Sequence, residues 1–416
     1  MDTAPTHGPN TDMLSGLPEG VLHRIMSFLT LRQAVQTCVL SHRWRNLWRS
    51  MPHINADYKQ FMVMGMVVTQ AGDEALVLFK RFVNRLLELR DPVASMDKFC
   101  LWYLISDDKD DDTDSQDDDN DDDTDSQDAV ANRWIGHALQ KQARVVEVDV
   151  ELVYADLKPL VLDHSVFTSC HLTKILFCNV ILGDGFFKQL KTGCPALEDL
   201  SLDLCIISDD EISSQTLKVL TITGTKFSME HRTSISTPSV TSLTLWSPDG
   251  MVVLKDIASV VTASVKLTND LVSDGSDARG LRQYLWTLSG VKNLEFHYLV
   301  TNLDMKLTIK SNLQLCPKFN NLVNLTLGQW CLDANFYALI VFMQNSPRLE
   351  KLTLKLDPFR HQTSQRIIGE LNERSFTCGH LKIVEVQCSE NDPRANHVVN
   401  FFVSTGMTSA QIHIKH

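Results

Sequence analysis

Long apolar runs are missing from this sequence. No stretch reaches the roughly 18 consecutive apolar residues that a helix needs to cross a bilayer. The first residues, MDTAPTHGPNTD, lack the basic region and apolar run of a secretory signal. We therefore expect a chain of the nucleus and/or cytoplasm that makes no contact with membranes.

Paired cysteines are missing as well. The chain has ten cysteines but no C-x-x-C pair, and several fall where the pattern predicts a core. This distribution indicates reduced, buried thiols rather than a disulfide framework or a zinc site. We expect no metal and no cofactor.

Catalytic motifs are also absent. The sequence contains no G-x-S-x-G, G-x-x-x-x-G-K-[ST], H-E-x-x-H or G-x-G-x-x-G. Gly183-Asp184-Gly185 runs straight into Phe186 and Phe187, which predicts a turn before a helix and not a phosphate-binding loop. We therefore predict no catalytic residues.

Net charge is small outside one segment. The formal net charge is −12, but residues 107–128 hold fourteen Asp and one Lys, so the rest of the chain carries +1. A nearly neutral body gives no support for nucleic acid as a partner. The acidic segment itself predicts a disordered insertion. Calcium binding is the alternative, but the glycine and closing glutamate of a calcium loop are missing.

Three short amphipathic pieces occupy residues 17–48. The first carries apolar residues at helical spacing, the second runs from Leu31 to about Cys38, and the third opens at Ser41, a good helix N-cap. The apolar stripe of the first is Val21, Leu22, Ile25, Met26 and Leu29, and that of the third is Trp44, Leu47 and Trp48. So short a stretch cannot bury this much apolar surface alone. The pattern is that of either the first layer of a larger helical core or a docking module for another protein.

The same residues resemble the F-box of plant F-box/leucine-rich-repeat proteins. The resemblance is carried by Leu17-Pro18, Ile25, Ser27-Phe28-Leu29, Thr37-Cys38-Val39-Leu40-Ser41, Arg43-Trp44-Arg45 and Leu47-Trp48. It implies a three-helix F-box at residues 14–53 that binds the Skp-type adaptor, and through it cullin, of a ubiquitin ligase. The implied adaptor-binding residues are Leu17, Pro18, Leu22, Ile25, Leu29, Val39, Leu40 and Trp44. Thr30 replaces a common proline and Gln33 a common acidic residue, and we expect Gln33 to loosen the cap of the second helix.

Two further segments flank this module. Residues 1–13 are polar with two prolines, which predicts a disordered tail. Residues 73–92 predict a helix that caps the open end of the following core, with Pro92 just past its end. Its apolar side comprises Leu76, Phe79, Phe82, Val83, Leu86 and Leu87.

A repeat of the form apolar-x-x-apolar-x-apolar begins at residue 96. Its copies are Met96-Phe99-Leu101, Val145-Val148-Val150, Leu172-Ile175-Phe177, Leu197-Leu200-Leu202, Leu217-Leu220-Ile222, Val240-Leu243-Leu245, Val291-Leu294-Phe296, Leu322-Leu325-Leu327, Leu349-Leu352-Leu354 and Leu381-Val384-Val386, with a weak copy at Val265-Leu267. From Val145 on, successive copies start 20–32 residues apart. The period is typical of leucine-rich repeats. We predict parallel strands whose last two apolar residues face one shared core.

The segments that return between strands divide into two kinds. Helical spacing appears around Leu281–Leu288, around Phe336–Met343 behind a possible cap at Asp333, and around Ala395–Phe402. Where the period shrinks, around residues 197–262, a helix of normal length does not fit. We predict loops or short turns there.

The repeats and the C-terminal region resemble the same plant proteins. Cys194-Pro195-Ala196-Leu197-Glu198-Asp199-Leu200 and Asn345-Ser346-Pro347-Arg348-Leu349 are similar to their leucine-rich repeats, and residues 376–416 to their FBD region. The predicted fold class is α/β: an F-box followed by an irregular leucine-rich-repeat solenoid over residues 96–375 and an FBD-like cap.

Side chains that flank the inward pair of each strand should form a concave, mostly polar face. We take Asp199, Asp203, Trp246, His297, Lys351 and Lys355 as candidate substrate-binding residues on it. Trp246 is the leading candidate because an exposed aromatic is a typical binding anchor, although it could equally pack against a neighbouring loop. His297 near Glu295 is more simply ordinary surface than an acid/base pair, since no nucleophile is near.

Three functions remain open. The first is a substrate-recognition subunit of a Skp–cullin–F-box ubiquitin ligase, with an unknown protein substrate. The alternative is a stand-alone leucine-rich-repeat scaffold or inhibitor, in which the N-terminal helices merely cap the solenoid. A hydrolytic enzyme is the least favoured, because no nucleophile–base pair is visible.

Overall fold

The structure is a computed structural model that describes residues 16–62, 68–105, 126–154, 157–250, 252–268, 278–299, 313–356 and 380–416. The predicted tail 1–13, residues 107–125 of the acidic insertion and residues 376–379 lie outside the described residues. The chain forms two compact units, Met1–Gly183 with Thr192–Leu197, and Asp184–Lys191 with Glu198–His416. Each unit is described by itself.

The N-terminal module is helical. It consists of α1 (Glu19–Met26), α2 (Leu31–Gln36), η1 (Thr37–Val39) and η2 (Leu47–Ser50). Its interior is formed by Leu22, Met26, Leu31, Ala34, Trp44, Leu47 and Trp48. The third predicted piece is turns followed by the short η2, yet its three stripe residues are buried together as their spacing predicts.

The cap of α2 differs from the expectation. Thr30 Oγ1 accepts the backbone N–H of Gln33 at 3.3 Å, and Gln33 Oε1 accepts the backbone N–H of Thr30 at 3.1 Å. These reciprocal bonds make a complete capping box. Because an amide oxygen accepts the bond as a carboxylate would, Gln33 holds the cap instead of loosening it. That prediction was wrong.

Hydrogen bonds connect the module to the end of the long helix that follows it. Helix α3 (Val68–Leu89) buries Leu76, Phe79 and Val83, as its predicted apolar side requires. Directly after α3, the buried guanidinium of Arg90 donates to the carbonyl of Met51 at 2.8 Å, and the N–H of Asp91 donates to the carbonyl of Arg49 at 3.0 Å. These bonds fix the end of the module to the end of α3.

Parallel strands form the main sheet in each unit. In the first unit they are β1 (His53–Asp57), β2 (Lys98–Ile105), β3 (Val145–Leu152) and β5 (Lys174–Cys178). In the second they are β7 (Asp199–Asp203), β10 (Val219–Thr223), β13 (Ser242–Trp246), β15 (Thr262–Thr268), β16 (Asn293–Leu299), β17 (Asn324–Gly328), β18 (Lys351–Lys355), β19 (Ile383–Gln387) and β20 (Ile412–Lys415). The helical module followed by this parallel arrangement confirms the predicted fold class.

The register aligns the inward residues in rows. In the second unit Leu202, Ile222, Leu245, Val265 and Phe296 pair in sequence from strand to strand, and all are buried. At the start of most strands, one carbonyl accepts two N–H groups of the next strand; that of Lys292, for example, accepts from Val323 and Asn324. Each strand therefore has one register.

Three repeats differ from the predicted alignment, and each contains alanine. The pairing makes Ala143-Val146-Val148 the copy in β3 and Val260-Ala263-Val265 the copy in β15, so both predicted copies were placed two residues too late. A further copy, Met51-Ile54-Ala56 in β1, was not predicted. The three alanines are at most 1% exposed. Their small side chains fill inward positions, but a repeat pattern defined by larger apolar residues does not include alanine.

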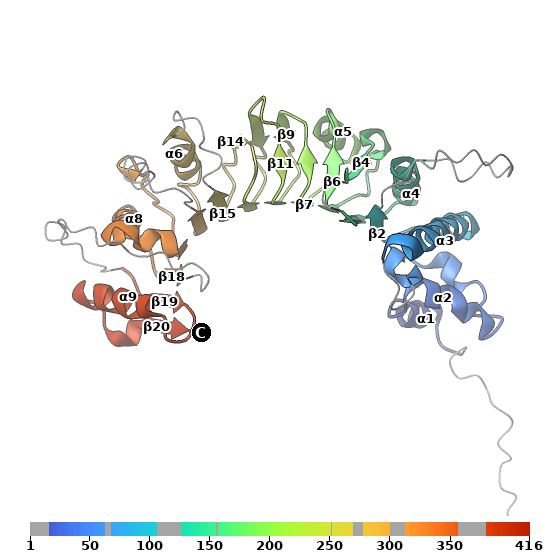
Figure 1. The fold of residues 1–416 in the computed structure, drawn as a ribbon, viewed down its shortest axis with the longest axis horizontal. Helices are drawn as coiled ribbons and strands as arrows, with labels where there is room; N and C mark the ends of the chain where they lie inside the picture. Colours follow the sequence, from blue (N-terminus) through green and yellow to red (C-terminus); the bar gives the residue numbers. More distant parts are fainter. Residues whose placement is uncertain are drawn as a thin grey trace, which may run out of the picture. The chain divides into compact units, whose positions relative to one another are not determined.

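The returning segments include helices and an outer layer of short strands. The helices are α4 (Gln127–Gln140), α5 (Phe186–Gly193), α6 (Ala278–Thr287), α8 (Asp333–Gln344) and α9 (Pro393–Ser404). The short strands are β4 (Leu160–Leu162), β6 (Val180–Leu182), β8 (Ile206–Ile207), β9 (Glu211–Ser213), β11 (Lys226–Phe227), β12 (Thr233–Ser236) and β14 (Val252–Asp256). In the second unit α6, α8 and α9 lie on the same side of the strands (Figure 1).

Both kinds of predicted returning segment are present. The predicted helices are α6, α8 and α9, and the turn at Gly183-Asp184-Gly185 leads into α5. The described residues between β7 and β15 contain no helix, as the short period predicted, but they carry β9, β12 and β14, which pair in parallel.

A left-handed residue ends three successive strands. Leu204, Gly224 and Ser247 follow β7, β10 and β13 with φ of 52°, 56° and 47°. Each donates its N–H to the carbonyl of the next-strand residue that pairs with the last residue of its own strand, for example Gly224 to Trp246 at 2.8 Å. This repeated turn sends the chain out of the sheet.

Gly224 provides a test of that turn. Gly224→Ala places a Cβ on a left-handed backbone and 2.7 Å from Leu204 Cδ2, so we expect a loss of about 1 kcal/mol in free energy of unfolding. The matched control is Gly290→Ala, where a Cβ meets nothing within 4 Å. Urea denaturation measures both, and equal stability of the two variants would contradict the proposed role of the turn.

Candidate functional site: an apolar docking surface and a polar sheet face

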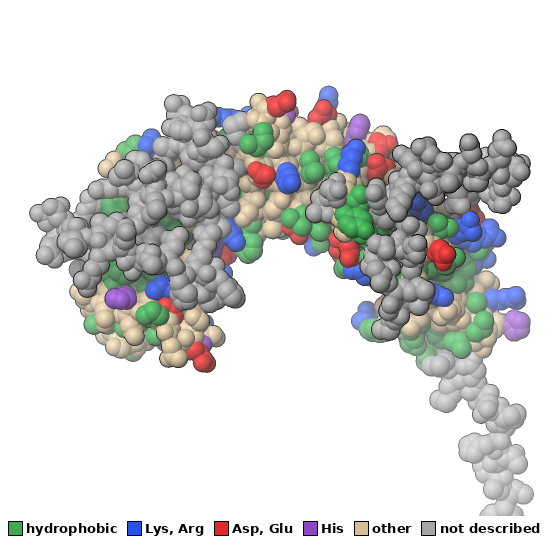
Figure 2. Space-filling model, in the orientation of Figure 1, with side chains coloured by type: hydrophobic (Ala, Val, Ile, Leu, Met, Phe, Trp, Pro, Cys, Tyr) green, Lys and Arg blue, Asp and Glu red, His purple; other side chains and the backbone are tan. Residues whose placement is uncertain are grey.

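Several large apolar side chains of the N-terminal module face solvent. Phe28 is 75% exposed, Val39 83% and Leu40 61%, and Val21 is also exposed. In Figure 2 hydrophobic side chains lie at the surface over α1 and α2, beside Lys and Arg side chains. We call Val21, Phe28, Val39 and Leu40 the exposed apolar set. Single exposed apolar residues are common, but several large ones on one small module are typical of an interaction site.

The predicted adaptor-binding residues divide by burial. Pro18, Val39 and Leu40 are exposed, and Leu17, Ile25 and Leu29 are half-buried. Leu22 is fully buried and Trp44 nearly so. These last two hold the module together and offer no surface to a partner, so we remove them from the candidate set.

Phe28 and Val21 were not among the predicted contact residues. Phe28 lies off the apolar stripe predicted for the first helix, and an apolar residue off that stripe is the signal that could have found it. Val21 was assigned to the stripe, yet it is 44% exposed. The guanidinium of Arg24 lies 5.1 Å from the centroid of the Phe28 ring. This cation–π contact holds the ring at the surface.

The second candidate site is the sheet face in the second unit that points away from the returning helices, which we call the open face. It carries the residues that alternate with the buried pairs: Ser264 and Lys266 on β15, Glu295 and His297 on β16, and Lys351 and Lys355 on β18. Buried and half-buried residues alternate along β15 and β16, as expected for a solvated face, whereas on β18 Thr353 is buried as well.

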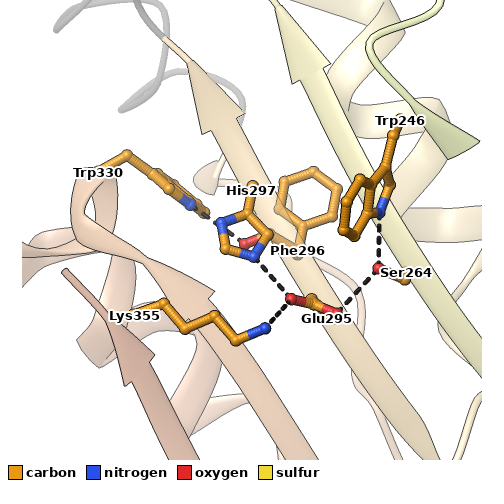
Figure 3. A network of polar contacts seen from close by, with 7 residues as sticks. All are labelled: Trp246, Ser264, Glu295, Phe296, His297, Trp330 and Lys355. Carbon is orange, nitrogen blue, oxygen red and sulfur yellow. Dashed lines mark hydrogen bonds and ion pairs between the residues drawn. The ribbon is translucent and has the colours of Figure 1, made fainter. Parts of the chain in front are cut away.

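A hydrogen-bonded cluster joins four strands of this face (Figure 3). It comprises Trp246, Ser264, Glu295, His297 and Lys355, which we call the polar cluster. The indole N–H of Trp246 donates to Ser264 Oγ at 2.8 Å, and Ser264 donates to Glu295 Oε2 at 3.0 Å. His297 Nε2 lies 3.0 Å and Lys355 Nζ 2.6 Å from Glu295 Oε1. Trp246, His297 and Lys355, predicted separately, are thus brought together.

Glu295 is the electrostatic centre of the cluster. The pKa of Glu295 is lowered to about 2. The largest cause is the hydrogen bond with His297, followed by those from Lys355 and Ser264, while burial acts in the opposite direction. The carboxylate is therefore charged at every physiological pH. It orients Ser264, and through Ser264 it orients the Trp246 ring.

The cluster does not have the geometry of a hydrolase. In a nucleophilic triad the histidine lies between the hydroxyl and the carboxylate and takes the proton. Here Glu295 lies between Ser264 and His297, and a carboxylate of such low pKa is a poor base. This order favours the interpretation of Glu295 and His297 as a structural pair.

Lys351 belongs to a neighbouring ionic group. Its ammonium lies 2.9 Å from Glu385 Oε1, and that of Lys415 lies 3.1 Å from the same oxygen. The hydrogen bond from Lys351 is the largest cause that lowers the pKa of Glu385. Asp199 and Asp203 are half-buried on β7 and take no part in either group.

Ser264 and Lys266 were not predicted, although they alternate with Val265 and Leu267, and that alternation could have revealed them.

Within the described residues, His, Cys, Asp and Glu side chains do not gather in groups of three that could hold a metal ion. No helix of the part of the chain that the structure describes is both long and apolar enough to cross a membrane.

A small helical module with exposed apolar side chains precedes the parallel repeat strands, and this order is consistent with an F-box followed by a leucine-rich-repeat solenoid. Residues 14–54 match the F-box domain. The chain therefore carries an F-box domain.

Relatives from plants extend the likeness over most of the chain. The meiotic F-box protein MOF of Oryza sativa subsp. japonica is 27% identical over 421 residues, which cover 92% of this chain and 81% of the relative. An F-box/LRR-repeat protein of Arabidopsis thaliana is 24% identical, covering 94% of this chain and 87% of its own length. An F-box/FBD/LRR-repeat protein of the same plant is 25% identical, covering 94% and 89%. These proteins are distant homologues of the chain.

The polar cluster makes a pH-dependent contribution to stability. Because its pKa in the folded chain lies below the ordinary 4.5, Glu295 stabilises the fold above about pH 4.5, and this contribution is lost as pH falls toward 2. We expect Glu295→Gln to lower the free energy of unfolding by about 1–3 kcal/mol at pH 7, and the difference from wild type to shrink below pH 4.5.

The control for this prediction is Glu350→Gln, which breaks an exposed pair with Lys382 and should cost less than about 1 kcal/mol. Denaturant titrations from neutral to acid pH measure both variants. A difference for Glu295→Gln that stayed constant between pH 7 and pH 3 would refute the assignment.

Proposed function

We propose that this chain is the substrate-recognition subunit of a Skp–cullin–F-box ubiquitin ligase. The F-box domain binds the Skp-type adaptor and, through it, cullin, while the open face of the repeats binds the protein substrate. The observation that carries the proposal is the exposure of Phe28, Val39 and Leu40 inside the segment that matches the F-box domain.

The exposed apolar set fits a partner that supplies helices. Burial of a large apolar side chain contributes about 1.5–3 kcal/mol, and this free energy is unused while the residues face water. Phe28 follows α1, and Val39 and Leu40 follow the end of α2, so the set lies at the ends of two short helices. Half-buried Leu17, Ile25 and Leu29 extend the same proposed surface. Together they suit an apolar helical groove or helix face on the adaptor.

The role of the chain in the ligase is to bring molecules together. Substrate held on the repeats would present its lysines to a ubiquitin-charged enzyme that the rest of the complex supplies. The chain itself contributes binding and orientation and no bond chemistry. The arrangement of Ser264, Glu295 and His297 described above supports this non-catalytic role.

A double substitution tests adaptor binding. Val39→Asp with Leu40→Asp puts two charges where the adaptor should bury apolar groups, so we expect recovery of a purified Skp-type adaptor to fall by at least about tenfold. Both residues are exposed, so the module should stay folded. Quantitative pull-down with the full-length chain measures the loss.

The matched control is Val93→Asp, which places the same charge at a valine that is fully solvent-facing and outside the module. It should leave adaptor recovery unchanged. If the double variant and the control recover equal amounts of adaptor, docking through this surface is ruled out.

The stand-alone scaffold is the second candidate function. It is favoured by the bonds that hold the module to the end of α3, from Arg90 to Met51 and from Asp91 to Arg49, because a cap has to be attached to the segment that follows it. The two functions make different predictions for the double variant. A scaffold retains its partners, whereas a ligase subunit loses its adaptor.

A further inference from the structure

Charge is unevenly distributed along the open face of the second unit. Strands β7, β10 and β13 present Asp199 and Asp203 and no cation. Strands β15 to β20 present four lysines, Lys266, Lys351, Lys355 and Lys415, against two glutamates, Glu295 and Glu385. The second group of strands thus carries a surplus of two positive charges.

The ion pairs show where the surplus lies. Lys355 is neutralised by Glu295 at 2.6 Å, and Glu385 is shared by Lys351 and Lys415, so one of those two cations is in excess. In the part of the chain that the structure describes, Lys266 forms no ion pair. Its ammonium lies 5.9 Å from the centroid of the Trp246 ring. The excess charge is therefore at Lys266 and around Glu385.

Trp246 adds an apolar platform beside Lys266. The two residues pair across β13 and β15, and Trp246 is 37% exposed. Because its N–H is held by Ser264, and Ser264 by Glu295, the ring cannot turn away without breaking the polar cluster. The Trp246 ring is thus fixed next to a cation that has no ion-pair partner. This arrangement suits a ligand in which an apolar side chain is followed by an acidic one.

We propose that the open face of β13 to β20 binds an extended acidic segment of the protein substrate, with an apolar residue against Trp246, an acidic residue at Lys266 and a second acidic residue at Lys351 and Lys415. This inference rests on the proposed function, and it specifies the chemistry of the substrate.

Strand spacing sets the distance between the two acidic residues. Neighbouring strands lie about 4.8 Å apart, and Glu385 on β19 is four strands from Lys266 on β15, which gives about 19 Å. An extended chain rises about 3.3 Å per residue. The segment therefore needs acidic residues about six positions apart, with the apolar residue one or two positions before the first.

Labelled synthetic peptides test the proposal on the full-length chain by fluorescence anisotropy. The first peptide has a leucine, a neighbouring Glu and a second Glu about six positions on, in a Gly/Ser background. The second carries Lys in place of both Glu, the third places the two Glu side by side, and a fourth carries Ser in place of the leucine. We expect the first to bind most tightly, and its affinity to fall as salt is raised.

Variants of the chain locate the binding. We expect Lys266→Glu to weaken the first peptide about tenfold, Lys266→Met about fivefold, and Trp246→Ala to remove the preference for leucine over serine. The control is Lys255→Glu on β14, which makes the same charge change on an exposed residue outside the open face. Thermal unfolding of each variant confirms that it is folded.

Each outcome decides the matter. Absence of binding, equal binding of the Glu and Lys peptides, or equal effects of Lys266→Glu and Lys255→Glu overturns the acidic-segment proposal. Equal binding of the first and third peptides overturns the two-point contact. Adaptor pull-down on the same preparations is independent of the open face, so a failed peptide experiment with intact adaptor recovery leaves the proposed ligase role standing.

Discussion

The stacking of inward side chains two residues apart is the constraint on which the structure depends. Each strand contributes such a pair, and a pair is buried only when the strands on both sides bring theirs into the same rows. Leu202, Ile222, Leu245, Val265 and Phe296 show this matching, since each pairs with the next and all are buried. At about 1.5–3 kcal/mol for each large apolar side chain, the rows contribute far more than any single polar contact in the chain.

The rows also determine what the opposite face can do. Residues that alternate with the inward pairs are aligned by the same register, so Trp246, Lys266 and His297 come to lie in one row from three distant parts of the sequence. They are not required for the core and can differ from repeat to repeat. A polar cluster such as the one around Glu295 then forms wherever neighbouring strands supply matching groups, and it fixes an aromatic ring without any cost to the rows beneath.

Much of this could be predicted from the sequence, and the failures have specific physical causes. The strands, the helices α6, α8 and α9 and the polar face followed from periodicity, because burial imposes it. The alignment failed at Ala143 and Ala263, and β1 with Ala56 was overlooked, because alanine fills an inward position without the hydrophobic signal of leucine. Ser264 was overlooked with them. The outer strands β9 and β12 each hold a single isoleucine among polar residues, and β14 has no alternation, so these strands lack the repeating apolar pair. The capping box at Thr30 and Gln33 follows the pattern Thr-x-x-Gln, and it was misjudged because only an acidic residue was expected to complete it.

The F-box domain shows why a sequence motif is not yet a binding site. Leu22 and Trp44 match the motif as well as Val39 and Leu40 do, but the first two fill the interior and the last two face solvent. A module of this size has only one thin interior, so about half of its apolar residues must serve stability. The remainder stay exposed at a cost in hydration that only a partner can recover. Burial therefore separates the residues that hold the domain together from those available for recognition, and the second set is the one on which adaptor affinity should depend.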